Sequence, residues 1–305
     1  MAAIPSAKDA NVLDGGYPPV RERWHLSIQG TCVRAQCIRS YSQSKPPKRR
    51  GKITSLSGNS RMRMLRFINR IDWPKVGFCN FITLTYPDEI DHRDYHRRTQ
   101  DRYVFLRNLE NKIQSLFAVI WRIEWKKRKT GSRVDTLMPH IHMLTIGVPG
   151  IRRDDVRKGW RNAIGRQHGP LATDIQWLDD GGAAARYLGK YVSKSEALDI
   201  PSYLNSGIQF GRHWGLNRVN MIPMAEVAYQ DTPEDKIMRR VKEVAADRLK
   251  GYDVDLSGGF TLFGQDVVDR VTLALQRNEF CTAGDESLLM RRSRWLQGEL
   301  VLTEL

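Results

Sequence analysis

The chain has 305 residues, of which 41% are hydrophobic, enough to fill a core of ordinary domain size with flanking segments. Its formal net charge of +15 attracts polyanions, so the sequence predicts nucleic acid as the partner, with an anionic membrane surface as the alternative. No stretch has the roughly 20 apolar residues needed to span a bilayer, and the first residues lack the pattern of a secretory signal. We therefore expect a cytoplasmic protein with no membrane partner. The four cysteines are irregularly spaced, which argues against a disulfide framework and a zinc ribbon.

Residues 1–60 are expected to form a basic N-terminal arm, because the run KPPKRRGK combines paired prolines with mutually repelling cations. An amphipathic helix is predicted over residues 61–71, where the apolar side chains follow one face. Arg63, Arg66 and Arg70 fall on the opposite face and are candidate DNA-binding residues. A charged face that is only solvated is the plainer interpretation of the same pattern.

The middle of the chain alternates predicted strands and helices. Segments rich in β-branched and aromatic residues, or with alternating side chains, indicate strands. The strands are expected at FITLTYP, FAVIWRIEW, PHIHMLTIGV and residues 174–178, with helices near residues 99–115, around Trp160 and over the segment YLGKYVSK. The second and third strands could pair as a hairpin. After about Pro223 the apolar spacing becomes helical, so residues 224–305 are predicted to be a C-terminal helical subdomain.

Two histidines stand two residues apart in the segment MPHIHML. Alternate side chains of a strand share one face, so His140 and His142 point together and could clamp a metal ion. A carboxylate from a neighbouring strand would favour Mg²⁺ or Mn²⁺, and Glu124 is the candidate. The alternative is a pair of polar residues on a half-exposed strand.

Two tyrosines follow in RYLGKYVSK. Residues three and four apart share one face of a helix, which groups Tyr187 with Lys190 and Tyr191, and Tyr191 with Lys194. A phenol with a pKa near 10 is a weak nucleophile at neutral pH. A metal ion that polarises a phosphate and a lysine that offsets developing charge would supply what it lacks. Without the histidines, burial of the tyrosine rings in the core would be the simpler interpretation.

Taken together, these segments resemble the HUH endonucleases, specifically the rolling-circle replication initiators of small phages and plasmids. The resemblance covers roughly residues 61–223. FITLTYP resembles the first motif of the family, and its threonines Thr83 and Thr85 are carried over as candidate DNA-binding residues. PHIHML resembles the metal motif, carried over onto His140 and His142. GRHWGLNR resembles a segment that follows the catalytic helix in some members.

YLGKYVSK resembles the nucleophile motif in its paired form, in which both tyrosines act. Glu124 matches the third metal ligand of the family by position only. The resemblance implies an α+β fold, RRM-like, with a central antiparallel sheet flanked by helices. The histidines would lie on a middle strand of this sheet and the tyrosines on a flanking helix.

The activity that this resemblance implies is initiation of rolling-circle DNA replication. A tyrosine would nick single-stranded origin DNA with the help of the metal ion, leaving a 5′-phosphotyrosine link and a 3′-OH. A host DNA polymerase and a host helicase would be partners, in a bacterial cytoplasm. An HUH-type transposase shares the same nuclease core, and a basic DNA-binding protein without catalysis is the alternative from another class.

Overall fold

The computed structural model describes residues 23–38, 53, 56–87, 90, 92–127, 136–165, 173–178, 180–193, 207–251 and 256–279. The chain divides into two compact units. Residues 44–227 form one, called here the central unit. Residues 1–43 and 228–305 form the other, the flanking unit. Among the described residues no helix is long and apolar enough to cross a membrane.

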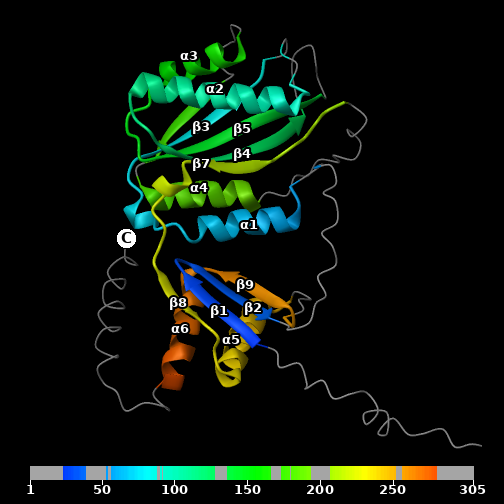
Figure 1. The fold of residues 1–305 in the computed structure, drawn as a ribbon, viewed down its shortest axis with the longest axis vertical. Coiled ribbons are helices and arrows are strands. Elements are labelled where there is room, and N and C mark those ends of the chain that lie inside the picture. The colour runs from blue at the N-terminus through cyan, green and yellow to red at the C-terminus, as the bar shows by residue number, and fades with distance from the viewer. Residues whose placement is uncertain are drawn as a thin grey trace, which may run out of the picture. The chain divides into compact units, whose positions relative to one another are not determined.

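An antiparallel sheet organises the central unit, as expected for the α+β class (Figure 1). Within the described part of the chain it has five strands in the order β6-β3-β5-β4-β7, so β5 is the middle strand. The strands are β3 (Cys79–Thr85), β4 (Ala118–Lys127), β5 (Leu137–Ile146), β6 (Thr173–Leu178) and β7 (Trp214–Asn217). The expected hairpin between the second and third predicted strands is confirmed, because β4 pairs with β5 over ten residues.

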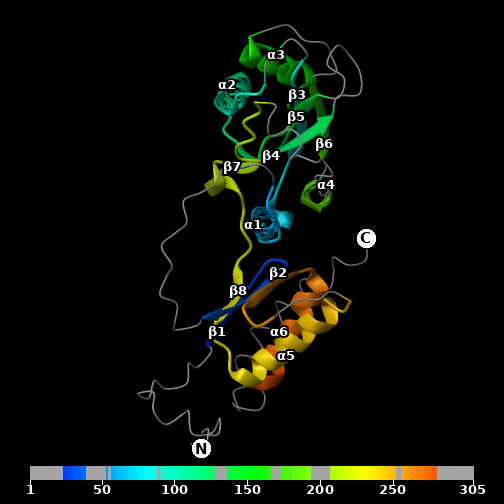
Figure 2. The same cartoon turned by 90° about the vertical axis from the view of Figure 1, so that its right-hand side faces the viewer.

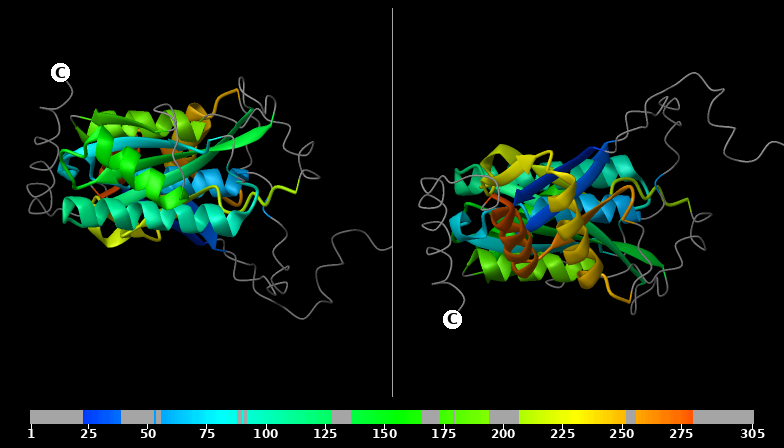
Figure 3. Two further views of the ribbon diagram at one scale, coloured as in Figure 1. Left: turned by 90° about the horizontal axis from the view of Figure 1, so that it is seen from above. Right: turned by 90° about the horizontal axis from the view of Figure 1, so that it is seen from below.

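Helices cover both faces of this sheet. On one face lie α2 (Tyr95–Ile113) and α3 (Arg153–Ile164), which run over the strands in the left view of Figure 3. On the other lie α1 (Gly58–Ile68) and α4 (Gly181–Ser193), seen end-on and side by side in Figure 2. The Ser57 hydroxyl caps α1 by accepting a hydrogen bond from the Ser60 amide, and the Asp94 carboxylate caps α2 in the same way at His96.

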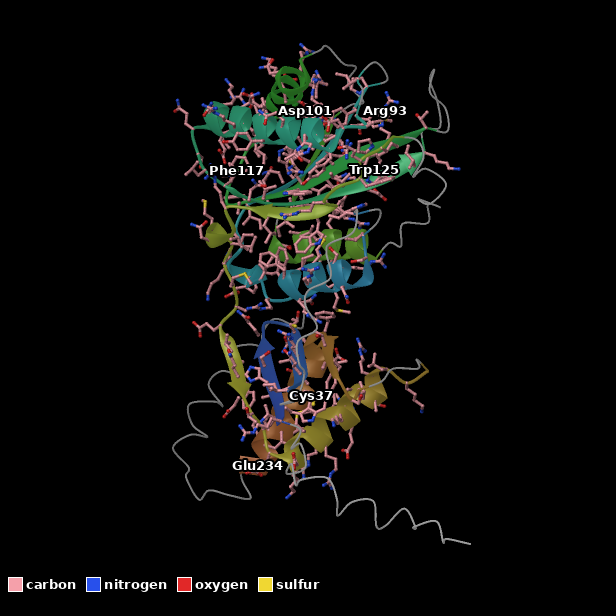
Figure 4. The ribbon with its side chains drawn as sticks, turned by 45° about the vertical axis from the view of Figure 1, so that its right-hand side comes forward. Cys37, Arg93, Asp101, Phe117, Trp125 and Glu234 are labelled. Atoms are coloured by element: carbon pink, nitrogen blue, oxygen red, sulfur yellow. The ribbon has the colours of Figure 1, made fainter. Side chains whose placement is uncertain are left out.

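Alternation along the strands sends side chains into two separate cores. Ile141 and Met143 of β5 join Trp121 and Trp125 of β4 in the core beneath α2 and α3. Figure 4 shows Trp125 and Asp101 in this layer, between the sheet and α2. Leu144 belongs to the smaller core beneath α1 and α4. Because both faces of β4 and β5 are covered, their sequences are nearly continuous in apolar residues.

The flanking unit is a second antiparallel sheet with two helices on one face (Figures 1 and 2). The order of its described strands is β8-β1-β2-β9. Its elements are β1 (Arg23–Gln29), β2 (Cys32–Ile38), β8 (Val227–Asp231), α5 (Asp235–Arg248), β9 (Gly259–Phe263) and α6 (Gln265–Glu279).

The flanking unit differs from two expectations. Residues 1–60 do not form only a basic arm, because residues 23–38 fold into the hairpin of β1 and β2. Residues 224–305 are not only helical, because β9 pairs with β2. The apolar residues Trp24, Leu26 and Ile28 alternate along β1 and face the helices, a period-2 pattern that the surrounding turn-forming residues obscured.

The segment GRHWGLNR contains β7 and requires two of its glycines. Gly211 has a φ of +66°, in the left-handed region, and a Cβ there would lie 1.9 Å from the Tyr95 ring. A Cβ on Gly215 would lie 2.5 Å from Cζ2 of Trp121. This indole is buried and the Arg102 guanidinium stacks 3.6 Å from its centroid, so it cannot easily move aside. The two glycines therefore let β7 reach the edge of the sheet.

Replacing Gly215 by alanine should destabilise the protein by about 1–3 kcal/mol, because the methyl group overpacks a filled site. The measurement is thermal unfolding followed by circular dichroism. Gly77→Ala is the control, since a Cβ at Gly77 meets nothing within 4 Å. Equal melting temperatures for the two variants would contradict this account of β7.

Candidate functional site

The two histidines lie together on the middle strand, next to two threonines of β3. In the register of β3 and β5, Thr83 is opposite His142 and Thr85 is opposite His140. Directly opposed residues of an antiparallel pair point to the same face. Thr83 Oγ1 is 3.0 Å from His142 Nδ1, and Thr85 Oγ1 is 3.1 Å from His140 Nδ1. Both imidazoles therefore turn Nδ1 toward β3.

On the other side of β5, Glu124 of β4 faces the same site. It is opposite His140 in the register, yet its Oε2 contacts Nε2 of His142 at 2.9 Å. Lys126 Nζ contacts the same carboxylate oxygen at 2.9 Å. Arg122, opposite His142 and buried, adds a second cation to this face of the sheet. The carboxylate thus lies among cations and a histidine, in a largely buried position.

These contacts shift the acid–base properties of the site. Burial works to raise the pKa of Glu124, but hydrogen bonds from His142 and Lys126 outweigh it and lower that pKa to about 2. Burial lowers the pKa of His142 below its ordinary value, although the hydrogen bond with Glu124 works in the opposite direction. At neutral pH the site therefore holds a carboxylate and a neutral imidazole, which are the forms that bind metal ions.

The donor set fits a hard divalent cation only in part. Two imidazoles and a carboxylate share one face, and the threonines fix the ring orientations as hydrogen-bond partners of metal-binding histidines do. The rings of His140 and His142 are nearly parallel, at 15°, with centroids 6.4 Å apart. In the part of the chain that the structure describes, however, no three His, Cys, Asp or Glu side chains already converge as a metal-binding group. Closure around an ion would require Glu124 to reach both histidines.

Tyr187 is connected to the histidines through one phenylalanine. Phe81 is two residues before Thr83 on β3 and shares its face. Its ring lies 5.6 Å from the ring of His142 at an interplanar angle of 25°, and 4.3 Å from the ring of Tyr187 at 55°. The aromatic contacts thus fix α4 against the strand that holds the histidines' threonine partners. Tyr187 is half-buried at this contact.

The remaining predicted residues are not brought into this cluster by any described contact. The backbone of α4 continues through Lys190 and Tyr191, but their side chains lie outside the described residues, as does the whole of Lys194. Arg63 and Arg66 lie on α1, with Arg63 exposed and Arg66 half-buried. Arg70 is exposed just beyond the end of that helix.

Sequence reasoning missed Phe81, Arg122 and Lys126. Their positions carry a usable signal, since Phe81 has the parity of Thr83 on its strand, and Arg122 and Lys126 have that of Glu124. Once a strand is known to present functional groups on one face, its other residues of the same parity become candidates too.

The difference in stability between the wild type and Glu124→Gln should depend on pH. A folded pKa of about 2, below the ordinary value of 4.5, means that the carboxylate stabilises the fold above pH 4.5. This contribution, on the order of 2 kcal/mol, should be constant from pH 8 to 5 and shrink as the pH falls toward 2. Urea unfolding at a series of pH values measures it. A difference that does not change with pH would refute the assigned ionisation.

One family matches the segment that carries this site. The family described as replication-associated protein ORF2 matches residues 79–196, from the start of β3 to just beyond α4. Comparison of the chain with curated proteins and with solved structures gives no match. The matched segment contains the histidines, Glu124 and the tyrosine helix, so over this part the chain is similar to replication-associated proteins.

Proposed function

We propose that the protein initiates rolling-circle DNA replication by nicking and joining single-stranded origin DNA through a tyrosine nucleophile. The similarity to replication-associated proteins supports the role in replication. The observation that carries the chemistry is the contact chain from Tyr187 through Phe81 to His142, which in turn contacts Glu124. It couples a candidate nucleophile helix to a candidate metal site.

In this proposal His140, His142 and Glu124 hold Mg²⁺ or Mn²⁺, which would act as a Lewis acid toward the scissile phosphate. The tyrosine phenol gives up its proton, and its oxygen attacks phosphorus. The bond to the 3′ oxygen breaks, and this oxygen takes up a proton to become a 3′-OH. Lys190 and Lys194 offset the negative charge that develops. The 3′-OH then primes a host DNA polymerase, while a host helicase separates the strands.

The course of α4 suggests different tasks for the two tyrosines. The helix begins beside the start of β3, where the charge of Asp180 helps to raise the pKa of Cys79, and reaches Phe81 at Tyr187. One further turn advances the helix by about 6 Å, close to the advance of two strand residues from Phe81 to Thr83. The backbone of Tyr191 would then be level with His142. We infer that Tyr191 makes the first nick and Tyr187 the second.

The test uses the full chain with Mn²⁺ and labelled single-stranded DNA that tiles the origin of its own replicon. Wild-type protein should form an adduct that survives denaturation and maps by mass spectrometry to a tyrosine, and chelator should abolish it. Tyr191→Phe should lose the first adduct. Tyr187→Phe should keep it but fail to join the strand, and the double variant should do neither.

Each outcome discriminates between functions. Adducts that form equally in both single variants would contradict the division of tasks between the tyrosines. Salt-sensitive binding with no adduct on any tile would instead indicate a DNA-binding protein without catalysis. Strand-transfer products between unlinked DNA molecules would indicate a transposase.

A further inference from the structure

The residues of β3 that face the site each contact a histidine, and one also contacts α4. Phe81 stacks on His142 and contacts Tyr187, Thr83 contacts His142, and Thr85 contacts His140. The resemblance to known families suggests DNA binding for the two threonines. In the structure, however, each hydroxyl lies within hydrogen-bond distance of an imidazole Nδ1. A role toward the histidines follows more directly from these contacts.

The hydrogen bonds at His142 define which nitrogen carries its proton. Glu124 is ionised and can only accept, so the 2.9 Å contact requires Nε2 of His142 to donate. Burial favours the neutral ring, which has one proton. Nδ1 is then unprotonated and accepts its hydrogen bond from the Thr83 hydroxyl. In this state the ring has no lone pair on Nε2 with which to bind a metal ion.

Metal binding through Nε2 reverses both requirements. The imidazole must then carry its single proton on Nδ1, which becomes a donor toward Thr83. A backbone carbonyl or a carboxylate at this position could only accept, and an N–H group could only donate. A hydroxyl does both, because rotation about its C–O bond exchanges the two roles. Thr83 can therefore remain bonded to His142 in either state.

We propose that Thr83, and Thr85 in the same way at His140, are positioning residues that follow a change of tautomer in the histidines when the metal ion binds. The proposal rests on the metal site of the proposed function. The ring keeps one proton throughout, since Nε2 releases a proton to solvent and Nδ1 takes one up. Glu124, no longer bonded to a ring N–H, becomes available to the ion.

Affinity for Mn²⁺ alone tests the role of the hydroxyl. Electron paramagnetic resonance of free Mn²⁺, titrated against the full chain without DNA, measures the dissociation constant. Thr83→Val keeps the shape of the side chain but removes the hydroxyl, and should weaken binding about 10- to 100-fold. Thr83→Ser restores the hydroxyl and should bind close to the wild-type affinity. Wild-type affinity in Thr83→Val would overturn the proposal.

Thr145→Val is the matched control. Thr145 belongs to the same pair of strands, is opposite Asn80 and is fully buried. Its hydroxyl is bonded to Asn80 on the other face of the sheet, 3.1 Å from the amide nitrogen. Loss of this hydroxyl should leave Mn²⁺ affinity unchanged. An equal loss of affinity in Thr145→Val and Thr83→Val would show a general weakening of the sheet and overturn the positioning role.

The tautomer itself is observable. Nuclear magnetic resonance of protein labelled with ¹⁵N-histidine, assigned with His142→Gln, should show the His142 proton on Nε2 without metal and on Nδ1 with saturating Mg²⁺. The same tautomer in both states would overturn the proposal, as would a wild-type chain that binds no Mn²⁺. A chain that shows the change but forms no DNA adduct would overturn only the proposed function.

Discussion

The register of β5 against its two neighbours is the constraint on which the site depends. His140 and His142 face threonines on one side and a carboxylate on the other only in this pairing. A slip of one residue would turn both histidines into the core beneath α2 and α3, and would place Ile141 and Met143 on the opposite face. Because each face is buried in its own apolar core, such a slip would cost both cores at once. The packing that stabilises the sheet therefore also fixes the geometry of the site.

The site is a strip of polar groups between apolar layers. Burial of a carboxylate beside cations is unfavourable unless each group is paired, and the contacts of Glu124 with His142 and Lys126 meet that requirement. Leu144, two residues after His142 on the same face, already belongs to the core beneath α1 and α4. The transition from polar site to apolar core thus takes place within one strand, and Phe81 on the neighbouring strand spans it.

Period-2 patterns in the sequence were sufficient to predict the strands of the central unit and the shared face of His140 and His142. Glu124 was named from its parity and its place on the preceding strand, and the structure brings it to His142. The bonds of Thr83 and Thr85 could not be predicted, because they depend on which residues of β3 stand opposite β5, and register between distant strands is not encoded locally. The sheet of the flanking unit was missed for a related reason. Its strands come from both sides of the central unit, and each is short when considered alone.

That discontinuity has a consequence for how the protein folds. During synthesis, residues 23–38 emerge first, yet β2 needs β9, more than 200 residues later, to complete its pairing. An isolated hairpin such as β1–β2 is only marginally stable in water. The whole of the central unit is made in the interval, and its own contacts are nearer in sequence. Its folding would shorten the effective loop between β2 and β8, and so lower the entropic cost of closing the second sheet. The central unit would thus serve as the scaffold on which the late-made half of the flanking unit finds its early-made partner.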